Sequence, residues 1–304
     1  MSLPQKRIEA LAEDFSQSVS RLGREASAKN VDRLRIAARR FETLIAFLCP
    51  KLSKKQQRML AELSELRKRA GKVRDLDAAA DLLGSTGNGS AAMDRRDLRL
   101  MLHEKRERQA RRLLVAAGRL EVAKLTEAML SVGRKNRPTS FDIQKKATQK
   151  KQETPEKDTE ENRNPLAQAR AELACVMEEV AASSKAKPGE LKPKRLHQIR
   201  VSVKGVCHLV EVAAPSQGQQ RFLEQLKSFE DVLGEWHDWQ ILVKAAEKQF
   251  ADRINCPLLV EIRAVVESKY AAAASAVAHM LAGPAAMKRK PRSVPSEQAV
   301  SRQA

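Results

Sequence analysis

The chain has 304 residues, of which 42 % are hydrophobic but only 3 % aromatic, with 12 glycines and 12 prolines. This composition disfavours β-sandwiches and doubly wound α/β folds and favours an all-α protein. Lys and Arg exceed Asp and Glu by 57 to 38, a net charge of +19, which indicates a polyanionic partner: nucleic acid, a phosphate polymer or an anionic membrane surface.

The N-terminal half shows helical periodicity from residue 5 to residue 135. A helix over 31–48 places its apolar residues on one face before Pro50, and a second runs from Ser53, a predicted N-cap, to Leu83. The glycine-rich stretch 84–90 predicts a flexible loop. A third helix is expected over 92–133.

The C-terminal half follows a charged stretch, 136–164, that has almost no large apolar residues and is predicted to be a solvated linker. The pattern then predicts four more helices, over 165–184, 196–213, 219–250 and 258–281. The tail 284–304 is polar and basic, and we expect it to be disordered.

The two halves resemble each other in order and spacing. Residues 31–50 align with 196–215, and 71–79 align with 234–242, with a proline, a glycine and an aspartate at matching positions. We therefore predict an antiparallel helical bundle of two pseudo-symmetric repeats, with one domain over 5–283 divided into halves 5–135 and 165–283. Residues 1–135 carry 30 basic and 17 acidic side chains and residues 165–283 carry 15 and 14, so the first half should dominate a polyanion-binding surface.

The four cysteines lie far apart and form no CxxC pair, and the N-terminus has no uninterrupted apolar stretch. A reduced cytoplasmic protein with cysteines buried in the core is the expectation. No apolar run approaches the length of a membrane span.

Basic stripes recur on helices of both halves. On the helix over 31–48, Asp32, Arg35 and Arg39 lie at one-face spacing. On the helix over 196–213, the residues at one-face spacing are His197, Arg200, Lys204 and His208. Such stripes can be solvated faces, but two in matching register can also face each other across a groove and follow an extended anion.

Two further features extend this basic pattern. Arg67 and Arg74 share a helix face, with Gly71 between them. The glycines Gly71 and Gly234 suggest close helix packing or a close approach of the backbone to something else. Asp75 and Asp238 can pair with neighbouring arginines.

The third helix carries a dense basic row at one-face spacing: Lys105, Arg108, Arg112 and Arg119, widened by Arg106 and Arg111.

These motifs resemble the CHAD family, the conserved histidine α-helical domain. The resemblance rests on an apolar-His-x-apolar-Arg pattern in each half, a Gly-x-x-(Arg/His)-Asp element one helix later and an Arg-rich third helix, and it covers about residues 5–283. Its members are two-fold pseudosymmetric helical bundles that bind inorganic polyphosphate through a basic surface and central pore. Some localise to polyphosphate granules, which extends the expectation for this chain to that location.

Pattern and resemblance together give the candidate polyphosphate-binding residues. They are Arg35, Arg39, Arg40, Arg74, Lys105, Arg106, Arg108, Arg112, His197, Arg200, Lys204, His237 and Lys269. Arg35, Arg39 and Arg106 are predicted to lie on exposed faces. Asp32 stands where the family has its first histidine, and Gly205, Cys207 and His208 also depart from the pattern, which makes a symmetric site doubtful.

No enzyme motif stands out: the sequence contains no GxxxxGK[ST], GxSxG, HExxH or HRD-type loop. We expect a binding protein without cofactor or metal. Two alternatives stay open, a nucleic-acid-binding protein and an accessory subunit of a phosphate-metabolism enzyme. The scarcity of aromatic residues argues against single-strand binding by base stacking, so nucleic acid is expected to be the weaker ligand.

Overall fold

The computed structural model describes residues 3–48, 53–85, 91–135, 165–184, 191–212, 217–253 and 255–281. None of these residues forms a β-strand, which confirms the all-α class. The helices are α1 (Leu3–Arg24), α2 (Ala28–Leu48), α3 (Lys54–Ser85), α4 (Ala92–Arg119), α5 (Val122–Lys135), α7 (Pro165–Ser184), α8 (Pro193–Val212), α9 (Gln217–Gln249) and α10 (Pro257–Leu281). Pro50, the stretch 136–164 and the tail 284–304 lie outside the described residues.

Local sequence explains several helix starts. Before α3, the Ser53 side chain accepts a hydrogen bond from the Gln56 backbone N–H (3.3 Å), while the Gln56 side chain accepts one from the Ser53 N–H (2.9 Å). This reciprocal capping box confirms the predicted N-cap. Helices α7, α8 and α10 each begin at a proline, whose fixed φ and missing N–H suit the first helical position.

The single helix expected over 92–133 is wrong, because the chain breaks at Leu120 and Glu121. Leu120 adopts an extended conformation (φ −76°, ψ 121°), and its N–H turns back to the carbonyl of Ala117. The break follows Gly118, a poor helix former. It lets α5 fold back against α1 and complete the first core.

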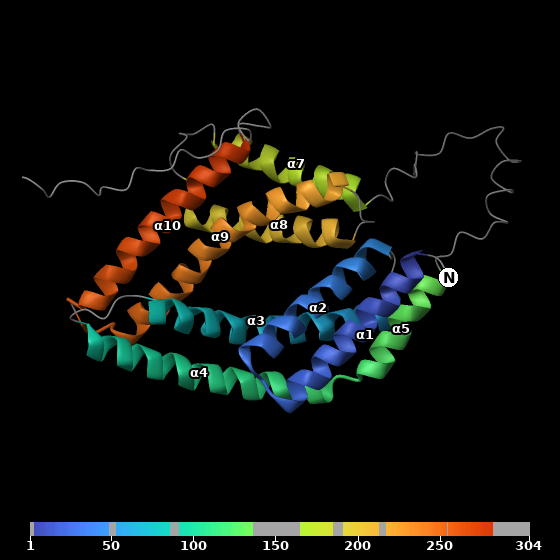
Figure 1. The fold of residues 1–304 in the computed structure, drawn as a ribbon, viewed down its shortest axis with the longest axis horizontal. Helices are drawn as coiled ribbons and strands as arrows, with labels where there is room; N and C mark the ends of the chain where they lie inside the picture. Colours follow the sequence, from blue (N-terminus) through green and yellow to red (C-terminus); the bar gives the residue numbers. More distant parts are fainter. Residues whose placement is uncertain are drawn as a thin grey trace, which may run out of the picture.

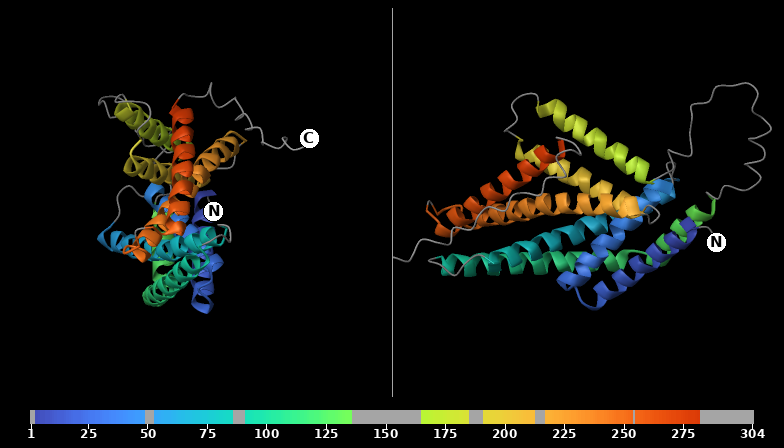
Figure 2. Two further views of the ribbon diagram at one scale, coloured as in Figure 1. Left: turned by 90° about the vertical axis from the view of Figure 1, so that its left-hand side faces the viewer. Right: turned by 45° about the horizontal axis from the view of Figure 1, so that its top comes forward.

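The described residues form three hydrophobic cores, which hold the bundle together. The first is built from α1 to α5 around Phe15 and Phe41, and the third from α7 to α10 around Trp236 and Phe229. The second joins the halves, where the end of α3 and the start of α4 pack on α9 and α10. Figure 1 shows residues 3–135 as one layer of helices and 165–281 as the other, and the right-hand view of Figure 2 shows α9 alongside α3.

Corresponding helices of the two halves have similar lengths and follow one another in the same order. Helix α2 packs on its counterpart α8, and α3 packs on its counterpart α9. The internal duplication itself stays a prediction. Four phenylalanines and both tryptophans are buried among the described residues. Of the cysteines, Cys207 and Cys256 are buried, but Cys175 is exposed on α7, so the expectation of burial is wrong there; Cys49 lies outside the described residues.

Candidate anion-binding site

Charged side chains gather where α2, α3, α8 and α9 meet. We call this set the central cluster: Arg35, Arg39 and Glu42 of α2, Arg67, Arg74 and Asp75 of α3, Arg200 and Lys204 of α8, and Glu230, His237 and Asp238 of α9. The cluster crosses the boundary between the halves, since Nη1 of Arg74 lies 2.7 Å from Oδ1 of Asp238. The sequence-based pairing of Asp238 with an arginine is thereby confirmed.

Most cations of the cluster are already neutralised. Arg35 binds Asp32 on its own helix at 2.9 Å, and Arg67 binds Glu42 at 2.7 Å. Lys204 lies 3.2 Å from Glu230. Burial opposes charge on Arg74, but the hydrogen bond and the charge of Asp238 outweigh it and raise the pKa of Arg74. These pairs fix the rotamers of the long side chains.

Two guanidinium groups of the cluster differ, because neither has an ion pair with any residue that the structure describes. Burial and the neighbouring Arg67 lower the pKa of Arg39. Burial also lowers the pKa of Arg200, whose Nε is buried without a hydrogen-bond partner in the described chain. Both groups are therefore partly desolvated cations for which a bound anion would supply the missing partner.

Arg35, Arg39 and Arg106 are all partly buried, so the expectation that they lie on exposed faces is wrong. For the first two the reason is that the basic stripe of α2 turns toward α3 and α8. Burial also raises the pKa of Asp75, partly offset by Arg74, so this carboxyl group is held in an unfavourable, desolvated position within the same cluster.

His197 of α8 and His237 of α9 form a ring pair with centroids 5.0 Å apart. Burial, with help from the charges of Arg200 and Lys244, lowers the pKa of His197, and burial with Arg200 lowers that of His237 to about 3. Both imidazoles are accordingly neutral near pH 7 in the free protein.

A smaller ionic group lies at the edge of the cluster around Glu211. Its Oε2 accepts a hydrogen bond from Arg40 at 3.1 Å, and Oε1 lies 3.4 Å from Lys227. Although burial opposes ionisation, the hydrogen bonds from His208 and Arg40 lower the pKa of Glu211 to about 2. Arg40 therefore joins α2 to α8, a structural contact that sequence reasoning had not anticipated.

The candidates on α4 fall into two groups. Arg108 and Arg112 are exposed and Lys105 is half-buried, and none of the three has an ion pair within the described chain. Arg106, in contrast, binds Asp77 at 2.9 Å and Glu107 at 3.0 Å and donates to the carbonyl of Ala26. Its side chain is only 19 % exposed, because it ties α4 to α3 and to the turn between α1 and α2. On α10, Lys269 pairs with Glu235 at 2.6 Å.

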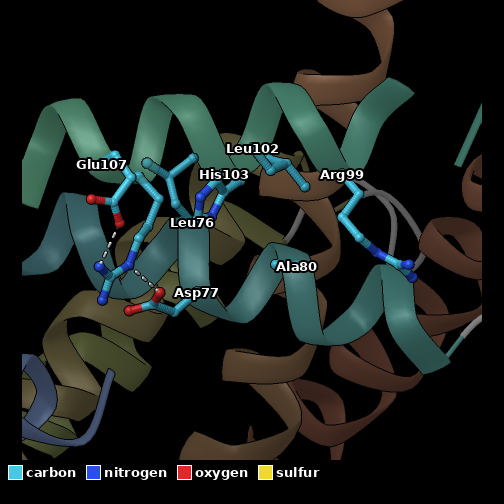
Figure 3. Close-up of a pocket in the computed structure, with 8 residues that line it drawn as sticks. Leu76, Asp77, Ala80, Arg99, Leu102, His103 and Glu107 are labelled. Atoms are coloured by element: carbon cyan, nitrogen blue, oxygen red, sulfur yellow. Dashed lines mark hydrogen bonds and ion pairs between the residues drawn. The ribbon is translucent and has the colours of Figure 1, made fainter. Parts of the chain in front are cut away.

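Beside Arg106, α3 and α4 enclose a hollow of about 240 Å³ (Figure 3). Asp77 and Glu107 at one end are held by Arg106, and Arg99 lies at the other end. The remaining lining is mainly apolar, from Leu76, Ala80 and Leu102. The hollow lies on the α4 side of α3 and is separate from the central cluster.

Gly71 and Gly234 do not mark close packing. A Cβ built at either position would meet no atom within 4 Å outside the neighbouring backbone, so the expectation of close helix contact is wrong. Both glycines border open space on the helices that carry Arg74 and Asp238.

The sequence did not reveal which carboxylates would neutralise which cations. Glu42 and Glu230 carry no motif, and only the packing of α2 on α3 and α8 on α9 brings them to Arg67 and Lys204. Lys244, whose charge reaches both histidines of the ring pair, was also missed; its place seven residues after His237 on α9 was the available signal.

Within the part of the chain that the structure describes, no group of His, Cys, Asp or Glu could hold a metal ion. No described helix is long and apolar enough to cross a membrane. What remains is an α-helical bundle in which the cations of α2, α3 and α8 converge beside the carboxylates of α9.

This combination places the protein in a known class. The family model of the CHAD domain matches residues 7–247, and the chain belongs to this family. Among solved structures, the fold is similar to "PptA from Streptomyces chartreusis" (19 % identity, TM-score 0.61, 90 % of this chain and 97 % of that chain). It is also similar to the CHAD domain from the plant Ricinus communis (13 % identity, TM-score 0.57, 91 % of this chain and 85 % of that chain). Among curated proteins, no relative matches.

Proposed function

We propose that this chain binds inorganic polyphosphate and acts as a binding protein rather than an enzyme. The observation that carries the proposal is the pair of partly buried guanidinium groups, Arg39 and Arg200, with which no described carboxylate forms an ion pair although carboxylates of the cluster lie near both. An arginine can hold two oxygens of a phosphate, and a charged hydrogen bond is strongest where water is excluded.

Membership in the CHAD family favours polyphosphate over other polyanions. Cytoplasmic location and recruitment to polyphosphate granules belong to the same proposal.

The ion-paired candidates have a supporting role in this proposal. Arg35, Arg74 and Lys204 are held by Asp32, Asp238 and Glu230, so their charge is largely compensated and they offer only part of their hydrogen-bonding capacity. The exposed cations of α4 add a non-specific electrostatic attraction for the polyanion.

A titration with long-chain polyphosphate at several salt concentrations tests the proposal. Tight binding with a strong negative dependence of log K on log salt is expected. Competition separates the nucleic-acid alternative: polyphosphate should displace the protein from DNA at low phosphate equivalents, and DNA should not displace it from polyphosphate. The reverse order would overturn the proposed ligand.

A second assay tests the absence of catalysis. Incubation with polyphosphate and Mg²⁺, followed by measurement of released phosphate, should give no more phosphate than a sample without protein. Release that requires the folded protein would make it an enzyme of phosphate metabolism.

A further inference from the structure

A cavity of about 240 Å³ lies between α3 and α4, outside the central cluster, and the proposed function does not use it. We call it the α3–α4 hollow. Its lining residues are Leu76, Asp77 and Ala80 of α3 and Arg99, Leu102, His103, Arg106 and Glu107 of α4 (Figure 3). The volume is that of about eight liquid water molecules, which suits a small organic molecule rather than a polymer or a folded partner.

The middle of the hollow is apolar. Leu76 and Ala80 lie one turn apart on α3, and Leu102, which is fully buried in the second core, lines the hollow from α4. Ala80 contributes only a methyl group where a longer side chain would fill the space. An apolar chain that lies against these three side chains leaves water without displacing a charged group.

One end of the hollow carries an excess of negative charge. Asp77 and Glu107 lie there, and Arg106 binds the first at 2.9 Å and the second at 3.0 Å. The third nitrogen of the Arg106 guanidinium group donates to the carbonyl of Ala26, so a single cation serves both carboxylates. Oδ2 of Asp77 has no hydrogen-bond partner in the described chain, and Glu107 is 42 % exposed. This end can therefore accept the positive group of a ligand.

The opposite end is basic. Arg99 lies there, exposed, and forms no ion pair with any residue that the structure describes. Asp97, two residues earlier on α4, lies 3.7 Å from Arg253 instead. His103, one turn after Arg99, adds an exposed imidazole to the lining between the two ends. An anionic group such as a carboxylate is the partner that Arg99 lacks.

The distance between the two ends limits the kind of ligand. Arg99 and Glu107 are eight residues apart on α4, which corresponds to about 12 Å of helix. An α-amino acid carries its ammonium and carboxylate groups on one carbon, so it reaches only one end. A ligand that reaches both ends needs several apolar carbons between its charged groups, and the lining between the ends is apolar as well.

We propose that the α3–α4 hollow binds a small zwitterion of the ω-amino acid type. Its carboxylate group binds Arg99, its ammonium group binds the end formed by Asp77 and Glu107, and its methylene chain lies on the apolar lining. This site goes beyond the proposed function. A polyphosphate chain is anionic along its whole length, so the carboxylates at one end of the hollow repel it.

Titration of the isotope-labelled full chain with 6-aminohexanoate, followed by NMR chemical-shift changes, tests the proposal. Hexanoate and hexylamine are the matched probes, because each keeps the apolar chain and only one of the two charged groups. The zwitterion should bind at least about fivefold more tightly than either probe, since each lacks one of the two ion pairs. Equal affinities of hexanoate and the zwitterion, or no binding of any of the three, would overturn the site.

Three variants locate the binding. Ala80→Leu fills the middle of the hollow and changes no charge, so it should abolish binding of 6-aminohexanoate and leave polyphosphate binding unchanged. Arg99→Ala should lower the affinity for 6-aminohexanoate to that for hexylamine. Arg96→Ala is the matched control, because Arg96 is exposed on α4 one turn earlier and does not line the hollow.

Circular dichroism checks that the variants are folded, and the two exposed arginine positions keep the test valid if Ala80→Leu does not fold. Unchanged binding in a folded Ala80→Leu variant, or equal losses in the two arginine variants, would contradict the proposed site. Long-chain polyphosphate should not displace 6-aminohexanoate. Displacement would show that the hollow belongs to the polyanion-binding surface and would overturn a separate site.

Discussion

The α2–α3 pair and the α8–α9 pair carry cations at matching positions but balance them differently. On α2, Arg39 faces another cation, Arg67, whose own partner is Glu42. On α8, Lys204 faces Glu230, which neutralises it. At the other matching pair of positions the order is reversed, because Arg35 binds Asp32 whereas Arg200 of α8 has no ion pair in the described chain. Each half therefore leaves one guanidinium group of the central cluster without an ion pair, but at positions that do not match.

The first prediction tests the contrast between the cations without an ion pair and the ion-paired cations, and it has the largest expected effect. Arg39→Ala combined with Arg200→Ala should weaken polyphosphate binding about a hundredfold, since two charged hydrogen bonds of about 1.5 kcal/mol each are lost. Removing the compensated pair with Lys204→Met and Glu230→Gln leaves the local net charge unchanged and should alter affinity less than about threefold. Isothermal titration at one salt concentration measures both, and equal losses would contradict the comparison.

The second prediction concerns a cation that serves the fold. Arg106→Met should lower the free energy of unfolding by about 2 kcal/mol, because Asp77 and the carbonyl of Ala26 lose a buried donor. Urea denaturation measures the loss. Arg108→Met, two residues away and exposed, is the control and should change stability by less than about 0.5 kcal/mol. Similar losses in the two variants would show that Arg106 is not the tie between α4 and α3.

The same contact changes the expected outcome of an obvious charge-reversal experiment. Replacing Arg35, Arg39 and Arg106 together by Glu would remove structural as well as binding interactions, because all three side chains are partly buried. Reduced binding in that triple variant would not separate the two effects, whereas the variants above do.

The third prediction follows from the ring pair. Because burial keeps His197 and His237 neutral, an unperturbed histidine pKa near 6.5 does not hold for them. Bound phosphate favours their charged forms, so affinity should be flat from about pH 7.5 to 6.5 and rise by up to about tenfold per pH unit below that range. Fluorescence titrations of polyphosphate binding, above and below about pH 6.5, measure the rise in affinity. The variant His237→Gln should reduce this rise.

The free protein should show the opposite response to acid. The pKa of His237 is about 3 in the folded chain and near 6.5 in the unfolded one. The unfolded chain therefore takes up the proton first, which favours unfolding. This loss of stability is absent above pH 6.5 and grows as the pH falls toward 3. Thermal melts between pH 7 and pH 4 should show a smaller loss for His237→Gln than for the wild type.

The smallest expected effect is on α10. Lys269 and Glu235 form a partly exposed pair. On its exposed face α10 carries the small neutral residues Ala271 and Ser275 where α4 has arginines. Lys269→Ala should change affinity less than about threefold and stability by less than about 0.5 kcal/mol. A salt slope reduced as much as by Arg108→Ala would show that α10 also contacts the polyanion.

The sequence predicted the helices well where strong local signals mark them, as at the Ser53 capping box and at the prolines that begin α7 and α10. It failed at Leu120, because no proline marks that break, Gly118 alone is a weak signal, and the packing of α5 on α1 is not visible in the sequence. For the site, spacing identified most of the cations. It could not separate Arg39 from Arg35, or Arg108 from Arg106, because the carboxylates that distinguish them come from other turns and other helices.

The three hydrophobic cores also bear on the order in which the chain folds. Every residue of the first core lies between Ile8 and Leu125, and every residue of the third between Ala169 and Val277. Only the second core needs both halves. During synthesis the first core can close before the ribosome has added α7, and the second forms last, when α9 and α10 dock on α3 and α4. Refolding should therefore pass through an intermediate with a folded first half and an unassembled central cluster.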